Sequence, residues 1–169
     1  MSTTHPLWDY SIELYDQSAL RDLLMQAQDS VKVDINFILL ALFASHHEVE
    51  LTTAFLDHAY AKTHDLRVVG INPIRTLRNA WKSKASLTSQ RTALLQLELS
   101  LERQLQDTLF ELFEPRLLQS QNAVVHLRPA ETLALTKGNL ALLHSESTVR
   151  WDDLTLKICQ QVLGAMAKQ

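Results

Sequence analysis

Apolar residues recur along most of this chain at the spacing of helices that are buried on one side. The most regular case is a leucine stripe over residues 90–113, and Pro115 is expected to end that helix. Residues 35–43 differ, because nearly every side chain there is apolar, which is typical of a helix at the centre of a bundle. We therefore predict an all-α fold built as a bundle of five to six helices.

Capping residues mark where several of these helices begin. Pro6 suits the first helical position, since its missing N–H is not needed there. Asp34 is a good N-cap before the apolar helix, and Asn72 with Pro73 marks another start. We expect the helix after Pro73 to run to about Lys84.

The last third of the chain has the weakest periodicity. Helical patterns begin at Pro129 and near Trp151, and residues 124–127 favour a short extended segment. We predict a helical bundle domain over residues 6–115. Residues 116–169 are expected to form a C-terminal helical extension that stands apart from the central core.

Composition narrows the class of protein. The 169 residues include only 3 glycines and 4 prolines, too few for the turns of a β-sandwich or a doubly wound fold. The single cysteine, Cys159, rules out an intramolecular disulfide. The N-terminus does not resemble a secretory signal, and no apolar run approaches the roughly 20 residues of a membrane span. These features predict a soluble, cytoplasmic protein.

Positive charge is concentrated in one segment. Residues 66–91 hold six Lys or Arg and no Asp or Glu, whereas residues 1–65 hold ten acidic and three basic residues. Arg75, Arg78 and Lys82 share one face of the predicted helix, and Arg67 extends the patch. Helix amphipathicity is expected to turn this basic face to solvent.

The basic face allows two interpretations. It is a candidate surface for a phosphate, a nucleic-acid backbone or an acidic protein. The favoured alternative is that its charges pair with the acidic first part of the same chain, since charge runs on helices are usually solvated faces.

A second candidate site is a small polar pocket at the end of the bundle, formed by Trp8, Asp9, Tyr15 and Asn36. Structural roles are the default for its polar members, because Asp9 lies in a first helical turn and Asn36 follows an N-cap. The alternative to these structural roles is that the polar pocket has a function.

Catalytic and metal chemistry have little support in the sequence. No glycine-rich phosphate loop, nucleophile motif or metal-binding motif occurs, and the histidines of residues 46–64 do not share one helical face. Cys159 is expected to be a small core residue. We predict no catalytic residue, no cofactor and no metal site.

Three blocks of residues follow one another in a fixed order along the first two thirds of the chain. The blocks are Leu7-Trp8-Asp9 with Leu14-Tyr15, then Gln28-Asp29 with Val33-Asp34-Ile35-Asn36, then Val68-Val69 with Pro73-Ile74-Arg75, Arg78 and Lys82. With these blocks, residues 6–115 resemble an uncharacterised family of short, all-helical proteobacterial proteins. The resemblance implies an all-helical fold but no activity.

These observations favour a non-catalytic interaction or regulatory protein, whose partner is expected to be another protein. Binding of an anion or nucleic acid through the helix that starts at Pro73 is the alternative, and an enzyme of unrecognised class is third. No membrane partner is expected. The sequence does not decide whether the chain forms a homo-oligomer.

Overall fold

The computed structural model describes residues 5–121, 127–144 and 148–166, and all regular elements in these ranges are helical. The all-α prediction is confirmed. No helix in this part of the chain combines the length and the apolar character that crossing a bilayer requires. The main helices are α1 (Pro6–Asp16), α2 (Ser18–Gln26), α3 (Ile35–His46), α4 (Thr53–Lys62), α5 (Asn72–Ala80), α6 (Thr88–Gln121), α7 (Pro129–Ala141) and α8 (Thr148–Met166).

Three short elements join these helices. Two are π-helical, η1 (Ala27–Val31) after α2 and η2 (Asp65–Ile71) after α4, and the third is a 3-10 turn, η3 (Ala85–Leu87), before α6. Element η2 runs directly into α5. The helix after Pro73 ends at Ala80 and a turn follows over residues 81–83, so the expected extension to Lys84 is wrong.

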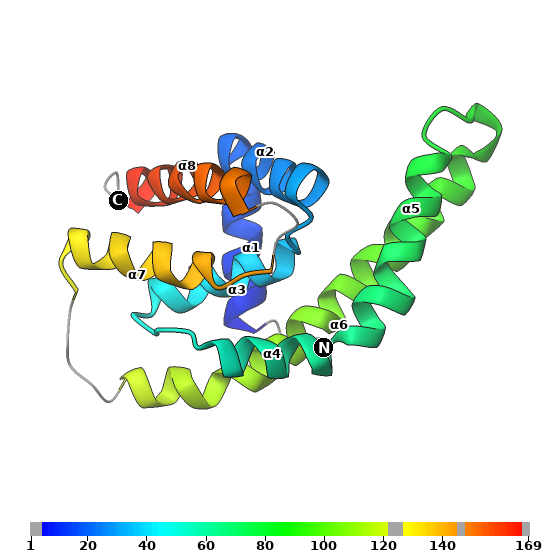
Figure 1. Cartoon of the computed structure of the whole chain (residues 1–169). Helices are drawn as coiled ribbons and strands as arrows, with labels where there is room; N and C mark the ends of the chain where they lie inside the picture. Colours follow the sequence, from blue (N-terminus) through cyan, green and yellow to red (C-terminus); the bar gives the residue numbers. More distant parts are fainter. Residues whose placement is uncertain (1–4, 122–126, 145–147, 167–169) are drawn as a thin grey trace.

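The molecule consists of a body and a projecting arm (Figure 1). Helices α1, α2, α3, α7 and α8 form the body, and α4 lies along its edge with the C-terminal half of α6. The arm is a helical hairpin of η2, α5 and the first half of α6, here taken as residues 65–100.

Helix α3 is the centre of the body. Phe37, Leu40 and Phe43 are each at most 1% exposed, so the prediction that this helix is the most enclosed part of the chain is confirmed. The side chain of Asp34 accepts a hydrogen bond from the backbone N–H of Asn36 and caps the helix as expected. Helices α1, α6 and α7 all pack against α3.

Helix α6 does not end at Pro115 and continues to Gln121. Proline removes one backbone hydrogen bond, but Phe113 and Leu117 on either side of it are buried against the body. That burial holds the helix together across the proline, because packing contributes more to helix stability than local propensity does.

The C-terminal helices share the core with α3. Helix α7 packs on α3 and α8 packs on α2, and Leu140, Trp151 and Ile158 belong to the same apolar cluster as Phe37. The expectation that residues 116–169 stand apart from the central core is therefore wrong. Amphipathic helices bury their apolar stripe wherever a matching surface exists, and the sequence does not reveal that surface. The segment expected at residues 124–127 lies almost entirely outside the described residues.

One buried amide ties α7 to the segment that follows α3. Asn139 is 0% exposed, and its side chain accepts a hydrogen bond from the backbone N–H of Leu51 at 2.8 Å. It also donates to the carbonyl of Val49 at 2.9 Å and to the hydroxyl of Ser45 at 3.0 Å. All the polar atoms of this amide are thus used to hold two elements together.

Candidate functional site

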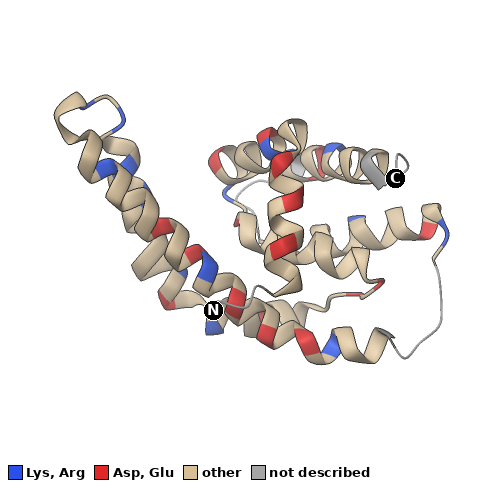
Figure 2. Ribbon diagram, turned by 180° about the vertical axis from the view of Figure 1, so that it is seen from behind, with Lys and Arg blue, Asp and Glu red and all other residues tan. Residues whose placement is uncertain are grey.

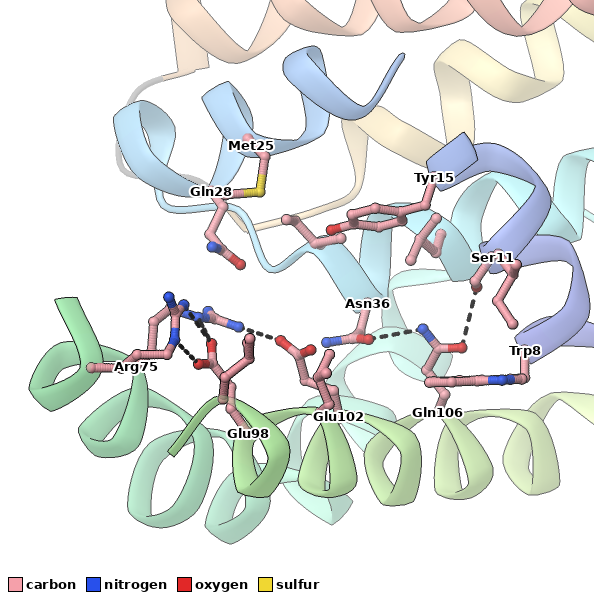
Figure 3. Close-up of a pocket in the computed structure, with 16 residues that line it drawn as sticks. Trp8, Ser11, Tyr15, Met25, Gln28, Asn36, Arg75, Glu98, Glu102 and Gln106 are labelled. Carbon is pink, nitrogen blue, oxygen red and sulfur yellow. Dashed lines mark hydrogen bonds and ion pairs between the residues drawn. The ribbon is translucent and has the colours of Figure 1, made fainter. Parts of the chain in front are cut away.

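A pocket of about 380 Å³ lies where the arm meets the body (Figure 3). Its walls come from α1, α2, η1, α3, α5 and α6. Pockets of roughly 300–1,000 Å³ commonly hold small organic ligands. Trp8, Tyr15 and Asn36 of the predicted polar pocket all line it, whereas Asp9 is exposed and does not.

Much of the pocket wall is apolar and open to solvent. Ile12 from α1, Met25 from α2, and Leu95 and Leu99 from α6 all line the pocket, although each side chain remains 38–47% exposed. Large apolar side chains from three helices are therefore directed to one opening. Burial of this surface by a bound molecule would be favourable.

Helix α1 has one face in the core and another along the pocket. Trp8, Ile12 and Tyr15 share one face of the helix by their spacing, but the buried residues of this helix are Leu7, Ser11 and Leu14. The face of Trp8, Ile12 and Tyr15 lines the pocket. Two apolar faces lie side by side on α1, and periodicity alone does not tell which one meets the core.

Four charged residues form one end of the pocket. The guanidinium of Arg75 donates from Nε to Glu98 Oε1 at 2.7 Å and from Nη2 to Glu102, and Arg78 donates from Nε and Nη2 to both oxygens of Glu98. The prediction that Arg75 and Arg78 face solvent is wrong, since they turn toward α6 and Leu77 is 41% exposed instead. The expected pairing with residues 1–65 is also wrong, because both acidic partners belong to α6.

The other two predicted basic residues lie elsewhere. The guanidinium of Arg67 stacks over Tyr60 at 4.8 Å and over Phe37 at 5.4 Å, and it donates to the backbone carbonyl of Tyr60. Lys82 is exposed near the tip of the arm, whose Lys and Arg residues are blue in Figure 2. The four residues therefore do not form one basic face.

The two glutamates respond differently to this environment. Burial by itself would raise the pKa of Glu98, but the hydrogen bonds from Arg78 and Arg75 outweigh burial and lower it. Burial raises the pKa of Glu102, the nearby charges of Glu98 and Asp34 also raise it, and Arg75 only partly offsets these effects. Glu98 is thus the stable counter-ion of the arginine pair, and Glu102 is the carboxyl group that protonates more readily.

A row of side-chain hydrogen bonds crosses the pocket floor. Ser11 donates to the side-chain oxygen of Gln106 at 3.2 Å, and Gln106 donates to that of Asn36 at 3.0 Å. Asn36 donates in turn to the Asp34 carboxylate at 3.3 Å. Burial raises the pKa of Asp34, against the hydrogen bonds from Asn36. These hydrogen bonds hold the side chains of the pocket floor in place, and most polar atoms of those side chains are already paired with one another.

Sequence reasoning missed Glu98, Glu102 and Gln106. Their spacing of i, i+4 and i+8 places them in one polar row along α6, beside the apolar pair Leu95 and Leu99. A polar row inside an otherwise apolar stripe was the signal that could have identified them.

Replacing Glu98 with Gln is expected to lower the free energy of unfolding by about 1–3 kcal/mol at neutral pH, since two guanidinium groups lose a charged acceptor. Because the folded-state pKa of Glu98 is lowered, its stabilisation is complete above the ordinary value of 4.5 and is lost as the pH falls through the lowered value. Urea unfolding at neutral pH and near pH 3 checks this. If Glu98→Gln lowers the free energy of unfolding by the same amount at both pH values, the result contradicts this prediction.

The residues that metal or thiol chemistry would need are few in the part of the chain that the structure describes. Within the described ranges, His, Cys, Asp and Glu do not gather in groups of three or more that could hold a metal ion. Cys159 is fully buried, which confirms it as a core residue, and burial raises its pKa to about 11. Its thiol is therefore poorly placed to react.

Comparison with known proteins yields a family but no relative of known activity. A family model described as a protein of unknown function matches residues 6–109, which is more than half of the chain. No curated protein and no solved structure matches. All the residues that line the pocket, from Trp8 to Gln106, lie inside the matched segment, whereas α7 and α8 lie outside it.

Proposed function

Since the chain belongs to the DUF2390 family of proteins of unknown function, we propose a function for it from the pocket inside the family's segment: non-catalytic binding of one small, largely apolar organic molecule. The observation that carries this proposal is the convergence of four partly exposed apolar side chains on one opening. They are Ile12, Met25, Leu95 and Leu99.

The energy of apolar burial supports binding at this place. A ligand that removes roughly 200 Å² of apolar surface from water gains about 5 kcal/mol, before the cost of association is subtracted. The pocket floor is held by the hydrogen bonds of Ser11, Gln106 and Asn36, so little reorganisation is needed when a ligand enters. Preorganisation of this kind reduces the cost of binding.

The arrangement supports binding over catalysis. Among the described residues that line the pocket, no hydroxyl or thiol is hydrogen-bonded to a histidine, carboxylate or other general base. The single hydroxyl hydrogen of Ser11 is shared between the backbone carbonyl of Leu7, at 2.7 Å, and the side-chain oxygen of Gln106, at 3.2 Å, so this hydroxyl is held in a structural role. A regulatory role follows naturally for a protein that binds a ligand without converting it.

The broader parts of the sequence-based hypothesis remain proposals. A protein partner fits the exposed apolar residues of the arm outside the pocket, such as Val69, which is 69% exposed. The cytoplasmic setting is a proposal that rests on the sequence alone. The structure gives nucleic-acid binding less support than the sequence did, because Arg75 and Arg78 are only 18% and 20% exposed and lie apart from Lys82, so they form no continuous basic surface for a phosphate backbone.

The test is to fill the pocket and to measure binding of a neutral apolar fluorophore, N-phenyl-1-naphthylamine. Leu99→Trp adds bulk at the pocket wall and is expected to weaken binding by about tenfold or more, since the ring occupies the space that the fluorophore needs. Leu97→Trp is the matched control, because Leu97 is 48% exposed on the same helix and does not line the pocket. Fluorescence titration gives the dissociation constants. Equal weakening in both variants, or none in either, would rule out this pocket as the binding site.

A further inference from the structure

We infer that the ligand is an organic anion, whose carboxylate or similar head binds Arg75 and Arg78 while its apolar part lies against Ile12, Met25 and Leu99. This inference rests on the proposed function and adds the chemical class of the ligand. It begins from the hydrogen-bonding capacity that the charged end of the pocket leaves unused.

The two arginines keep unused donors. A guanidinium carries five N–H groups. Arg75 uses Nε and Nη2 on Glu98 and Glu102, and Arg78 uses Nε and Nη2 on Glu98 alone. Within the described part of the chain, neither Nη1 group has a hydrogen-bonding partner, although both side chains line the pocket and are only 18% and 20% exposed. Donors therefore outnumber acceptors at this end of the pocket.

Glu98 holds the pair in place without competing for a ligand. Both of its oxygens already accept hydrogen bonds from the arginines, and its side chain is only 4% exposed. The guanidinium planes are thus fixed before a ligand arrives. Arginine forks held in this way match the geometry of a carboxylate or a phosphate.

A further donor comes from the opposite wall. Gln28 extends from η1 toward the charged end and lies across the pocket from Arg75 (Figure 3). The wider turn of this π-helical segment places Gln28 there, and π-helical turns often occur at functional sites. In the described part of the chain, its amide makes no hydrogen bond, so it is available to a bound head group.

Glu102 is expected to decide how tightly an anion binds. Arg75 bonds to one of its oxygens, and no hydrogen bond to the other is seen in the described residues. An ionised Glu102 repels an anionic head, whereas a protonated one can donate a hydrogen bond to it. Replacement with the neutral amide removes the repulsion and keeps a donor.

The experiment compares octanoate with octanamide as competitors of bound N-phenyl-1-naphthylamine. The two molecules share a chain and differ in head group. Octanoate is expected to displace the fluorophore at about tenfold lower concentration, the difference that charge-assisted hydrogen bonds to an arginine pair provide. Arg78→Gln should remove this preference, and Glu102→Gln should strengthen it by about threefold or more.

Lys82→Gln is the control for general attraction of anions, because Lys82 is exposed on the arm and does not line the pocket. It should leave the preference for octanoate unchanged. If Arg78→Gln unfolds, Arg78→Lys keeps the charge but not the fork and should still reduce the preference. A parent protein that binds the fluorophore but is displaced equally by both competitors overturns the anion inference and leaves the proposed function standing. A parent that does not bind the fluorophore, and is not stabilised against heat by either competitor, overturns both.

Discussion

A chain that ends at Glu114 is expected to lose the cooperative unfolding transition of the full-length protein. The deletion removes α7 and α8 and uncovers the faces of α3 and α2 against which they pack. Burying one large apolar side chain contributes about 1.5–3 kcal/mol, whereas a whole domain is stable by only about 5–15 kcal/mol. Six of the lost side chains are large and buried, and their burial together is comparable to the stability of a whole domain. They are Leu140, Leu143, Trp151, Leu154, Ile158 and Val162.

Calorimetry and near-ultraviolet circular dichroism of the shortened chain measure this loss directly. A full-length Trp151→Ala variant tests the same packing without deletion. It should lower the free energy of unfolding by about 3–5 kcal/mol, because Trp151 is 2% exposed and donates to the carbonyl of Leu140. A shortened chain with a sharp transition near the parent temperature would instead support residues 6–115 as an independent folding unit.

The Asn139→Leu variant is expected to lower the free energy of unfolding by about 3–5 kcal/mol, through loss of hydrogen bonds that no water can replace. Leucine has a similar volume, so the cavity contribution is small. The substitution leaves the buried N–H of Leu51 and carbonyl of Val49 without their partner, and each unsatisfied group costs about 1–3 kcal/mol. The hydroxyl of Ser45 also loses the hydrogen bond that it accepts from the Asn139 amide.

Thr136→Val provides the matched control for Asn139→Leu. Thr136 lies one turn earlier on α7 and is also buried, but its hydroxyl donates only to the carbonyl of Thr132 within the same helix. Its replacement should cost no more than about 1 kcal/mol. Guanidinium unfolding of both variants gives the comparison. Similar small losses in the two variants would show that the bonds of Asn139 do not tie α7 to the segment after α3.

The local sequence determined the helical class, several helix starts and the central helix. Capping at Asp34 and the start at Pro6 depend on neighbouring residues only, so they can be predicted from the chain itself. The burial of α3 follows from an apolar surface on all sides, which leaves no face that favours water. The end of α6 could not be predicted, because the body of the protein stabilises the helix beyond Pro115.

The sequence also identified part of the site by residue type. Trp8, Tyr15 and Asn36 were expected in a pocket and line one. Of the four residues expected on one basic face, only Arg75 and Arg78 line this pocket. The sequence could not predict the direction in which Arg75 and Arg78 point. An amphipathic helix turns its charged face to solvent by default, but carboxylates on a neighbouring helix can bury that face instead.

The tertiary structure alone decided where the site lies. Glu98 and Glu102 meet Arg75 and Arg78 only because the chain reverses at the tip of the arm and brings α6 back along α5. The pocket then forms where this hairpin joins the body. Local patterns determine helices because their hydrogen bonds join residues a few positions apart, whereas a pocket depends on contacts between elements that are distant in the sequence.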